Sequence, residues 1–194
     1  MTHALILFAH PCAESFSSAL HDVVIKTLQA RSWSVDDCDL NAENFSPILT
    51  EAERRGYHEE PANIEPVRPY VERLQAADAL ILVFPVWNFG YPAILKGFFD
   101  RVFLPGVSFQ LVDGKVQPNL QNITKLAAVT TYGGTRLRAF FAGDPPRRIV
   151  KRHLRYVCHA QAQTRYLALY DMNRATAEDR DTFLGKVEMS MQTF

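Results

Sequence analysis

The chain has 194 residues, which is enough for one domain with a complete hydrophobic core and too few for two comfortable ones. Of these residues 47% are apolar and 22% are charged, a balance typical of a folded globular protein rather than a disordered one. The 21 basic and 21 acidic side chains cancel, which argues against non-specific binding to nucleic acid or to an anionic membrane.

The start of the sequence has the features of a cytoplasmic protein. Residues 4–9 are apolar, but a secretory signal needs a longer apolar core and a membrane span needs roughly 20 apolar residues. Cys12, Cys38 and Cys158 are odd in number and widely spaced, which indicates reduced thiols rather than disulfides or a zinc site. We therefore expect a cytoplasmic protein with no metal site and no membrane insertion.

The first half of the chain alternates short apolar runs with amphipathic segments. Residues 4–9 are continuously apolar, as expected of a strand that is buried on both faces. Apolar residues recur at helical spacing over residues 15–30, and residues 33–40 predict a second strand. Residues 47–66 are irregular or form short helices. Residues 69–77 predict a helix that leads into the next strand.

The second half continues this alternation. Residues 79–84 predict a fully apolar strand, and residues 93–103 predict a helix with a broad apolar face. Residues 107–116 alternate up to the tight-turn dipeptide Asp113-Gly114, which predicts a small hairpin. The remaining elements are a strand over residues 125–131, a helix over 146–158, a strand over 164–170 and a helix over 175–191.

Five strands joined by helical crossovers predict one domain over residues 1–194, built on a parallel sheet with helices on both faces. Ligands of such sheets bind beyond the carboxyl ends of the strands, where the strand order reverses. The loops that follow the first, third and fourth strands meet at this edge, and they span residues 10–17, 85–92 and 130–135. These loops are also the least ordinary stretches of the sequence, so we expect the ligand there.

The first loop opens directly onto a helix. A helix N-terminus presents unpaired N–H groups, and the hydroxyls of Ser15 and Ser17 add donors that suit a phosphate. The two serines could equally serve only as helix caps. The glycine patterns of nicotinamide-binding folds and of nucleoside triphosphatases are absent. No cation follows Cys12 within six residues, which favours an unreactive thiol over a phosphatase nucleophile.

The second and third loops suit a planar ring. Residues 85–92 contain three aromatic residues and two prolines, a composition that favours stacking on a flat ligand. The alternative is that Trp87 and Phe89 are core or dimer contacts. Gly133 and Gly134 follow the fourth strand directly and permit close approach of the backbone to a ligand, although paired glycines also form ordinary turns.

Together these stretches resemble the flavodoxin-like NAD(P)H:quinone oxidoreductases. The most specific match is the run FPVWNFGYPAILKGFFDRVF over residues 84–103, which is similar to the family's flavin loop and the helix after it. Residues 9–11 with 15–16 resemble its flavin-phosphate loop, and residues 130–134 resemble the segment beside the flavin ring. The resemblance implies a flavodoxin-like three-layer sandwich with a five-stranded parallel sheet of order 2-1-3-4-5 and a small hairpin insertion.

The resemblance also implies a cofactor and the residues that bind it. The cofactor is FAD, with FMN as the alternative, and NAD(P)H is the hydride donor. The residues expected at its phosphate-bearing chain are His10, Ser15, Phe16 and Ser17. The residues expected at its ring are Pro85, Val86, Trp87, Asn88, Phe89, Thr131, Tyr132, Gly133 and Gly134.

The implied activity is the two-electron reduction of a quinone or another small aromatic acceptor, with both substrates using one pocket in turn. Tyr132 or Arg136 is then expected to stabilise the negative charge that develops on the flavin or the substrate. Alternatives are an azo or nitro reductase and a regulatory flavoprotein subunit of a membrane transporter. An electron-carrier flavodoxin is disfavoured, because such a protein would be strongly acidic and this chain has no net charge.

Two further expectations concern surfaces. By resemblance the protein is a homodimer, with residues 93–103 and 107–116 as the candidate interface. The basic run over residues 147–155 has two interpretations. Its charges fall opposite apolar residues at helical spacing, which indicates a solvated helix face, and the alternative is a site for the 2′-phosphate of NADPH.

Overall fold

The computed structural model describes residues 1–194. Its centre is a five-stranded parallel sheet with the order β2-β1-β3-β6-β7. The strands are β1 (His3–Phe8), β2 (Ser34–Asp39), β3 (Ala79–Val86), β6 (Lys125–Tyr132) and β7 (Gln163–Leu169). With the two hairpin strands left out of the numbering, this order is 2-1-3-4-5, so the predicted flavodoxin-like sandwich is confirmed.

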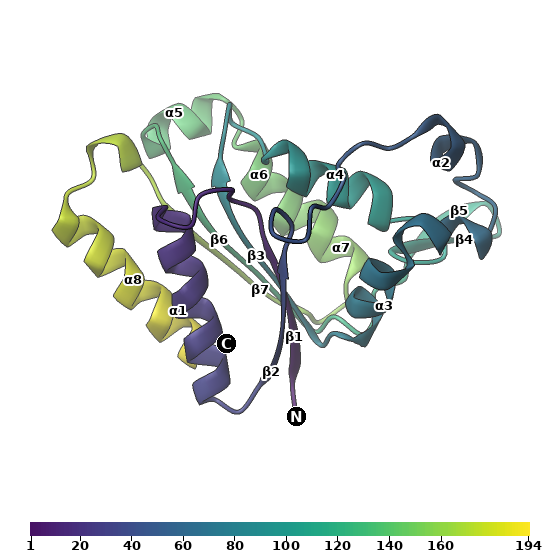
Figure 1. Ribbon diagram of the computed structural model, residues 1–194, viewed down its shortest axis with the longest axis horizontal. Coiled ribbons are helices and arrows are strands. Elements are labelled where there is room, and N and C mark those ends of the chain that lie inside the picture. Colours follow the sequence, from purple (N-terminus) through teal and green to yellow (C-terminus); the bar gives the residue numbers. More distant parts are fainter.

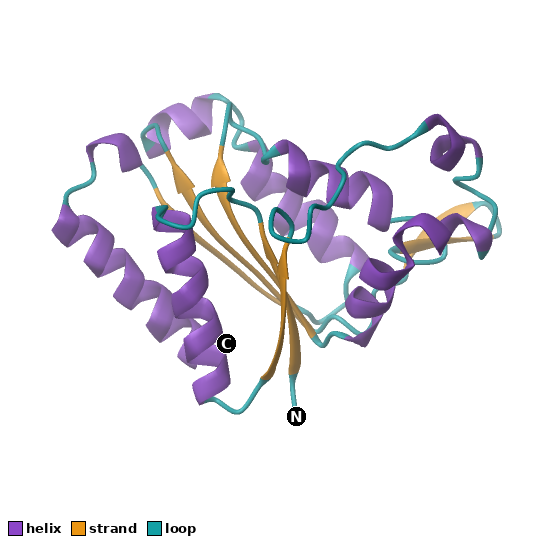
Figure 2. Ribbon diagram, viewed as in Figure 1, coloured by secondary structure: helices purple, strands orange, loops and turns teal.

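Helices cover both faces of the sheet, which makes three layers (Figures 1 and 2). One face carries α1 (Phe16–Ala30) and α8 (Ala177–Gln192), which lie side by side. The other carries α3 (Arg68–Ala76), α4 (Ala93–Val102) and the helical segment formed by α6 (Pro145–Arg148), a π-helix (Ile149–Leu154) and α7 (Arg155–Val157). None of the helices is both long and apolar enough to cross a lipid bilayer.

The core is divided in two by the sheet, because successive side chains of a strand point to opposite faces. One cluster of 28 buried residues contains Leu5, Leu7 and Leu82 and packs against Val71 of α3 and Phe98 of α4. The other, of 16 buried residues, joins alternate strand residues to α1 and α8 and includes Ala4, Ile6, Ile81, Leu20 and Val187. Burial on both faces explains why these strands are continuously apolar in the sequence.

The remaining elements lie outside this sandwich. They are α2 (Glu51–Arg55), 3-10 helices at Ala62–Val67 and Met172–Arg174, α5 (Arg136–Phe141), and the hairpin strands β4 (Phe109–Val112) and β5 (Lys115–Pro118). At the hairpin turn Asp113 and Gly114 have φ of 51° and 73°, the left-handed pair that a two-residue hairpin loop requires. The predicted hairpin insertion is thus confirmed.

Three local features differ from the sequence-based expectation. Strand β3 continues through Pro85 to Val86. Pro85 has no N–H to donate toward the side of β3 that faces β1. Strand β1 ends opposite Val83, so no strand lies beside Pro85 on that side and no hydrogen bond of the sheet is lost. The short helix α5 was not predicted, and the helix expected over residues 146–158 contains a π-helical segment in its middle.

Candidate functional site

The three loops expected to bind a ligand do meet at the carboxyl edge of the sheet. They follow β1, β3 and β6, and the imidazole of His10 meets the ring of Trp87 edge-on with 5.8 Å between the ring centroids. The second and third loops come together around a cavity of about 290 Å³. Its lining residues are Val86, Asn88, Phe89, Tyr132, Gly133, Gly134, Arg138 and Asn173. Arg138 and Asn173 were not anticipated from the sequence.

The second loop forms a tight turn whose aromatic side chains are exposed to solvent. Trp87 and Gly90 exchange two backbone hydrogen bonds of 3.2 and 2.8 Å, while Asn88 and Phe89 between them adopt φ of 49° and 57°. Left-handed backbone at two non-glycine residues is costly, and such strain tends to occur at ligand sites. Trp87 is 46% exposed and Phe89 is 40% exposed, so neither is a core residue. The amides of Asn88 and Phe89 donate no hydrogen bond within the protein, which leaves both free for a ligand.

The third loop supplies the opposite wall. Neither Gly133 nor Gly134 donates its amide hydrogen within the protein. A β-carbon added at Gly133 would lie 3.2 Å from the side-chain amide of Asn173, so the glycine keeps this wall clear. Pro85 and Thr131 are paired in register and buried directly before the two loops, where they support the cavity without lining it.

The first loop lies beside this cavity rather than in its wall. The hydroxyl of Ser15 caps α1 by accepting from the amide of Ser18 at 3.1 Å, so the capping interpretation holds for this serine. The amides of Phe16 and Ser17 have no acceptor in the protein, as expected in the first turn of a helix. His10 accepts from the amide of Cys12 at 3.0 Å. The loop therefore offers free amides to an anion next to the cavity.

Tyr132 differs from the other lining residues because its hydroxyl is engaged inside the protein. The side chain is 2% exposed, its hydroxyl donates to Asp144 at 2.5 Å, and the hydroxyl of Tyr166 lies 2.6 Å away. Its ring stacks on Tyr170 with 4.5 Å between centroids. Burial, together with Tyr166 and Asp144, raises the pKa of Tyr132 far above its usual value, so it stays neutral. Arg136, the other predicted catalytic residue, does not line this cavity.

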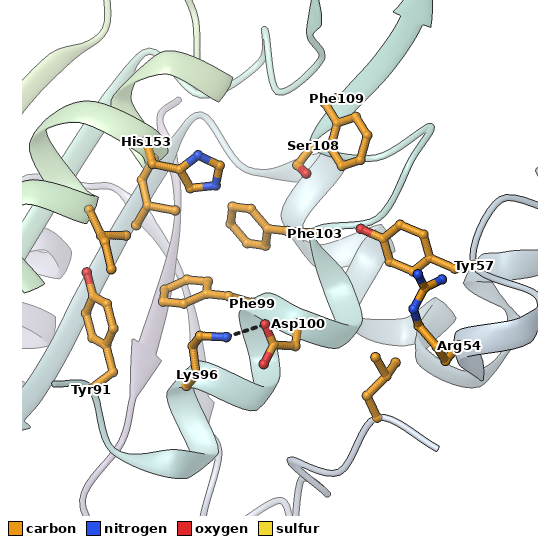
Figure 3. Close-up of a pocket in the computed structure, with 13 residues that line it drawn as sticks. Arg54, Tyr57, Tyr91, Lys96, Phe99, Asp100, Phe103, Ser108, Phe109 and His153 are labelled. Carbon is orange, nitrogen blue, oxygen red and sulfur yellow. Dashed lines mark hydrogen bonds and ion pairs between the residues drawn. The ribbon is translucent and has the colours of Figure 1, made fainter. Parts of the chain in front are cut away.

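A larger hollow of about 540 Å³ lies between α4 and the π-helical segment, and Tyr91 of the second loop also lines it (Figure 3). Its floor is aromatic, with Phe99 and Phe103 placed between His153 on one side and the Lys96–Asp100 ion pair on the other. It shares no lining residue with the 290 Å³ cavity. Its apolar floor, and the absence of any lining residue shared with the 290 Å³ cavity, indicate a contact surface rather than a second catalytic cavity.

The cysteines show no sign of a nucleophile or a metal site. Burial raises the pKa of both Cys38 and Cys158 to about 12, which suppresses the reactive thiolate. Cys12 is exposed in the first loop, and all three thiols are free. No group of three or more His, Cys, Asp or Glu side chains is arranged to hold a metal ion.

The sequence matches the family model described as a flavodoxin-like fold over residues 2–183. It is 32% identical over 146 residues to NAD(P)H dehydrogenase (quinone) 1 of Rattus norvegicus, and the match covers 67% of this chain and 53% of that protein. The chain thus spans about half the length of the rodent relatives it matches.

Two solved structures resemble the whole chain. The protein Smu.1420 from Streptococcus mutans UA159 superimposes with a TM-score of 0.86 at 28% identity and covers 100% of both chains. An NAD(P)H:quinone oxidoreductase from Methanothermobacter marburgensis superimposes with a TM-score of 0.81 at 24% identity and covers 98% of both chains. At that identity the second likeness shows the fold alone.

Proposed function

Because the chain belongs to the flavodoxin-like family, we propose that it is a cytoplasmic, single-domain flavin enzyme that transfers electron pairs from NAD(P)H to quinones or similar small aromatic acceptors. The observation that carries this proposal is the cavity at the ends of β3 and β6, where a strained aromatic turn faces a glycine wall. The rat relative and the Methanothermobacter marburgensis structure carry names that describe this activity. Reduction of azo or nitro compounds is the alternative acceptor chemistry.

The residues of the cavity fit a flavin ring. The ring would lie between Phe89 and the glycine wall, with the free amides of Asn88, Phe89 and Gly133 available to its heteroatoms. The phosphate-bearing chain would reach the free amides of Phe16 and Ser17, with His10 and Ser15 beside them. FAD is the proposed form and FMN the alternative. A bound flavin supplies the capacity to accept and donate a hydride.

The protein's part is to orient this ring and to stabilise charge on it. Tyr132 and Arg136 remain our proposals for stabilising negative charge. The hydroxyl of Tyr132 already donates to Asp144, so Tyr132 would act by its position, as a side chain that Asp144 and Tyr170 fix in the cavity lining. We add Arg138 to them, since it is the one cation that lines the cavity.

The direct test is the absorption spectrum of the flavin-loaded protein in the absence of oxygen. We expect NADPH to bleach the flavin peak and a quinone to restore it, and the released cofactor would distinguish FAD from FMN. In the same assay Arg138→Gln should slow the bleaching of the flavin about tenfold, because the variant lacks the cation that we propose stabilises negative charge on the ring. Tight flavin binding without bleaching would instead favour the alternative of a regulatory flavoprotein subunit. Failure to bind flavin would refute the proposal.

We further propose that the protein is a homodimer joined through α4 and the hairpin. Both border apolar surface: Phe99 and Phe103 line the 540 Å³ hollow, and on the hairpin Leu111 and Val116 are 56% and 54% exposed. Burying such groups in a second copy would remove them from water.

The dimer proposal predicts a mass of two chains in sedimentation equilibrium at micromolar concentration. Leu111→Glu should shift the equilibrium toward one chain, because a carboxylate cannot be buried there without a partner. Met189→Glu is the matched control, since Met189 is 63% exposed on α8, which lies on the other side of the sheet. A single-chain mass for the wild-type protein would contradict the proposal.

A further inference from the structure

A third hollow of about 350 Å³ lies next to the stacked rings of Tyr132 and Tyr170. We call it the basic pocket, and its lining residues are Arg136, Phe140, Gly143, Asp144, Arg147, Arg148, Lys151, Arg152 and Tyr170. It shares no lining residue with the 290 Å³ cavity. The two are nevertheless neighbours, because Tyr132 of the cavity stacks on Tyr170 and donates to Asp144, and both of these line the basic pocket.

The basic pocket carries a much larger excess of positive charge than the chain as a whole. The chain as a whole has no net charge, yet this hollow brings together five cationic side chains and one carboxylate. None of the five forms an ion pair, whereas six Arg and Lys side chains elsewhere each have a carboxylate partner. Arg147 bonds only the hydroxyl of Tyr170, at 3.4 Å, and the other four make no side-chain hydrogen bond. Unpaired cations held close together favour a bound anion.

Two separate parts of the chain build this arrangement. Gly143 and Asp144 adopt φ of 81° and 45° at the turn between α5 and α6, and Arg136 of α5 lines the same hollow as Arg147 of α6. The following cations lie where α6 passes into the π-helical segment, and π-helical turns occur frequently at functional sites. A solvated helix face would not need a cation from a second helix, so the pocket favours the other interpretation of the basic run.

The walls specify the kind of anion. Arginine side chains bind phosphate through paired N–H groups, and aromatic rings stack on a nucleobase. The pocket has four arginines together with the rings of Phe140, which is 70% exposed, and Tyr170. A phosphate joined to a planar base is a nucleotide. In NADPH the nicotinamide and the 2′-phosphate lie toward opposite ends of the molecule, which suits two hollows separated by one wall.

We propose that the basic pocket binds the adenosine 2′-phosphate end of NADPH and makes the protein prefer NADPH to NADH. This inference rests on the proposed function, in which NAD(P)H delivers a hydride in the neighbouring cavity. It assigns a role to Arg148, Lys151 and Arg152, which the hydride-transfer cavity does not use.

Arg148→Gln and Lys151→Gln test the proposal, because neither side chain has a bonding role in the fold. Each should lower kcat/KM for NADPH roughly tenfold and change kcat/KM for NADH less than twofold, since a charged hydrogen bond to phosphate is lost only with NADPH. Lys26→Gln, an exposed lysine on α1, is the matched control and should change neither value. An equal loss with both donors, or no loss with either, would overturn the inference.

An acceptor with a negative charge is the other possible source of an anion. Comparing an uncharged with a sulfonated naphthoquinone separates the two. If the variants impair only the sulfonated acceptor and leave the NADPH value unchanged, the pocket serves the acceptor and the inference fails.

A binding measurement separates failure of this inference from failure of the proposed function. Calorimetric titration of the flavin-loaded protein with adenosine 2′-monophosphate and with adenosine 5′-monophosphate needs no turnover. We expect the 2′ isomer to bind at least roughly tenfold more tightly, and Arg148→Gln to remove that preference. Equal binding of the isomers overturns the inference even if the flavin is reduced. A 2′ preference with no flavin reduction by either donor refutes the hydride-transfer function and, with it, the assignment to NADPH.

Discussion

Replacing Gly97 by alanine is expected to lower the free energy of unfolding by about 2–3 kcal/mol. Gly97 lies in the middle of α4 and packs against the loop at Pro47, where an added β-carbon would be 2.4 Å from three atoms. Two of these, the α-carbon and the carbonyl oxygen of Pro47, belong to the backbone and cannot swing aside as a flexible side chain could. The helix or the loop must move instead, and the packing between them is lost.

Thermal unfolding of the flavin-free protein measures this effect, and the midpoint should fall by about 4–12 °C. Gly185→Ala is the matched control because it adds the same methyl group inside α8, where nothing lies within 4 Å of the new β-carbon. That change should raise the free energy of unfolding by about 0.5–1 kcal/mol, since alanine favours helix over glycine. Shifts of the same sign and size in both variants would show that the contact with Pro47 is not what requires glycine.

The second large effect is expected at Gly133, where valine should weaken flavin binding at least roughly 100-fold while the protein still folds. The added side chain would extend from the glycine wall into the cavity, where we propose the ring lies. The near neighbour of its β-carbon is the side chain of Asn173, which is exposed and can move aside. Fluorescence titration with FAD and with FMN measures the affinity.

The same crowding could act indirectly, by displacing Asn173 and the loop that carries it. The double variant Gly133→Val/Asn173→Ala removes that clash and keeps the valine. If the valine blocks the ring itself, the double variant binds flavin as poorly as Gly133→Val. Recovery of near wild-type affinity in the double variant would locate the effect in the loop, and would contradict our placement of the ring.

The sheet could be predicted from the sequence because strands buried on both faces leave an unmistakable apolar run. The runs over residues 4–9, 79–84 and 125–131 each became a central strand, and the strand order followed from the resemblance. Once the strands were located, the loops after them could be predicted as the ligand site, because parallel strands bring their carboxyl ends to one edge of the sheet. The predicted and observed structures therefore agree for the central strands, whose sequence is determined by burial.

The elements that were missed depend on other signals. Helix α5 has only six residues, too few to establish a helical period, and its apolar residues Leu137, Phe140 and Phe141 are exposed rather than packed on the core. Only Thr135, as its cap, marked the start. Asn173 reaches the cavity from the segment after β7, about 40 residues from Gly133 in the chain, and no local pattern predicts such a return. Five cations around one hollow likewise require the turn at Asp144, a left-handed non-glycine residue.

The pairing of α1 with α8 has a consequence for how the chain folds. These helices close one face of the sheet together, although about 150 residues separate them in sequence. Contacts between such distant segments form late, because a long loop must first lose its freedom. As the chain leaves the ribosome, β1, β3 and β6 can associate with α3 and α4, while the opposite face is covered by α1 alone until α8 emerges. We therefore expect this face to be where incompletely synthesised chains recruit chaperones or aggregate.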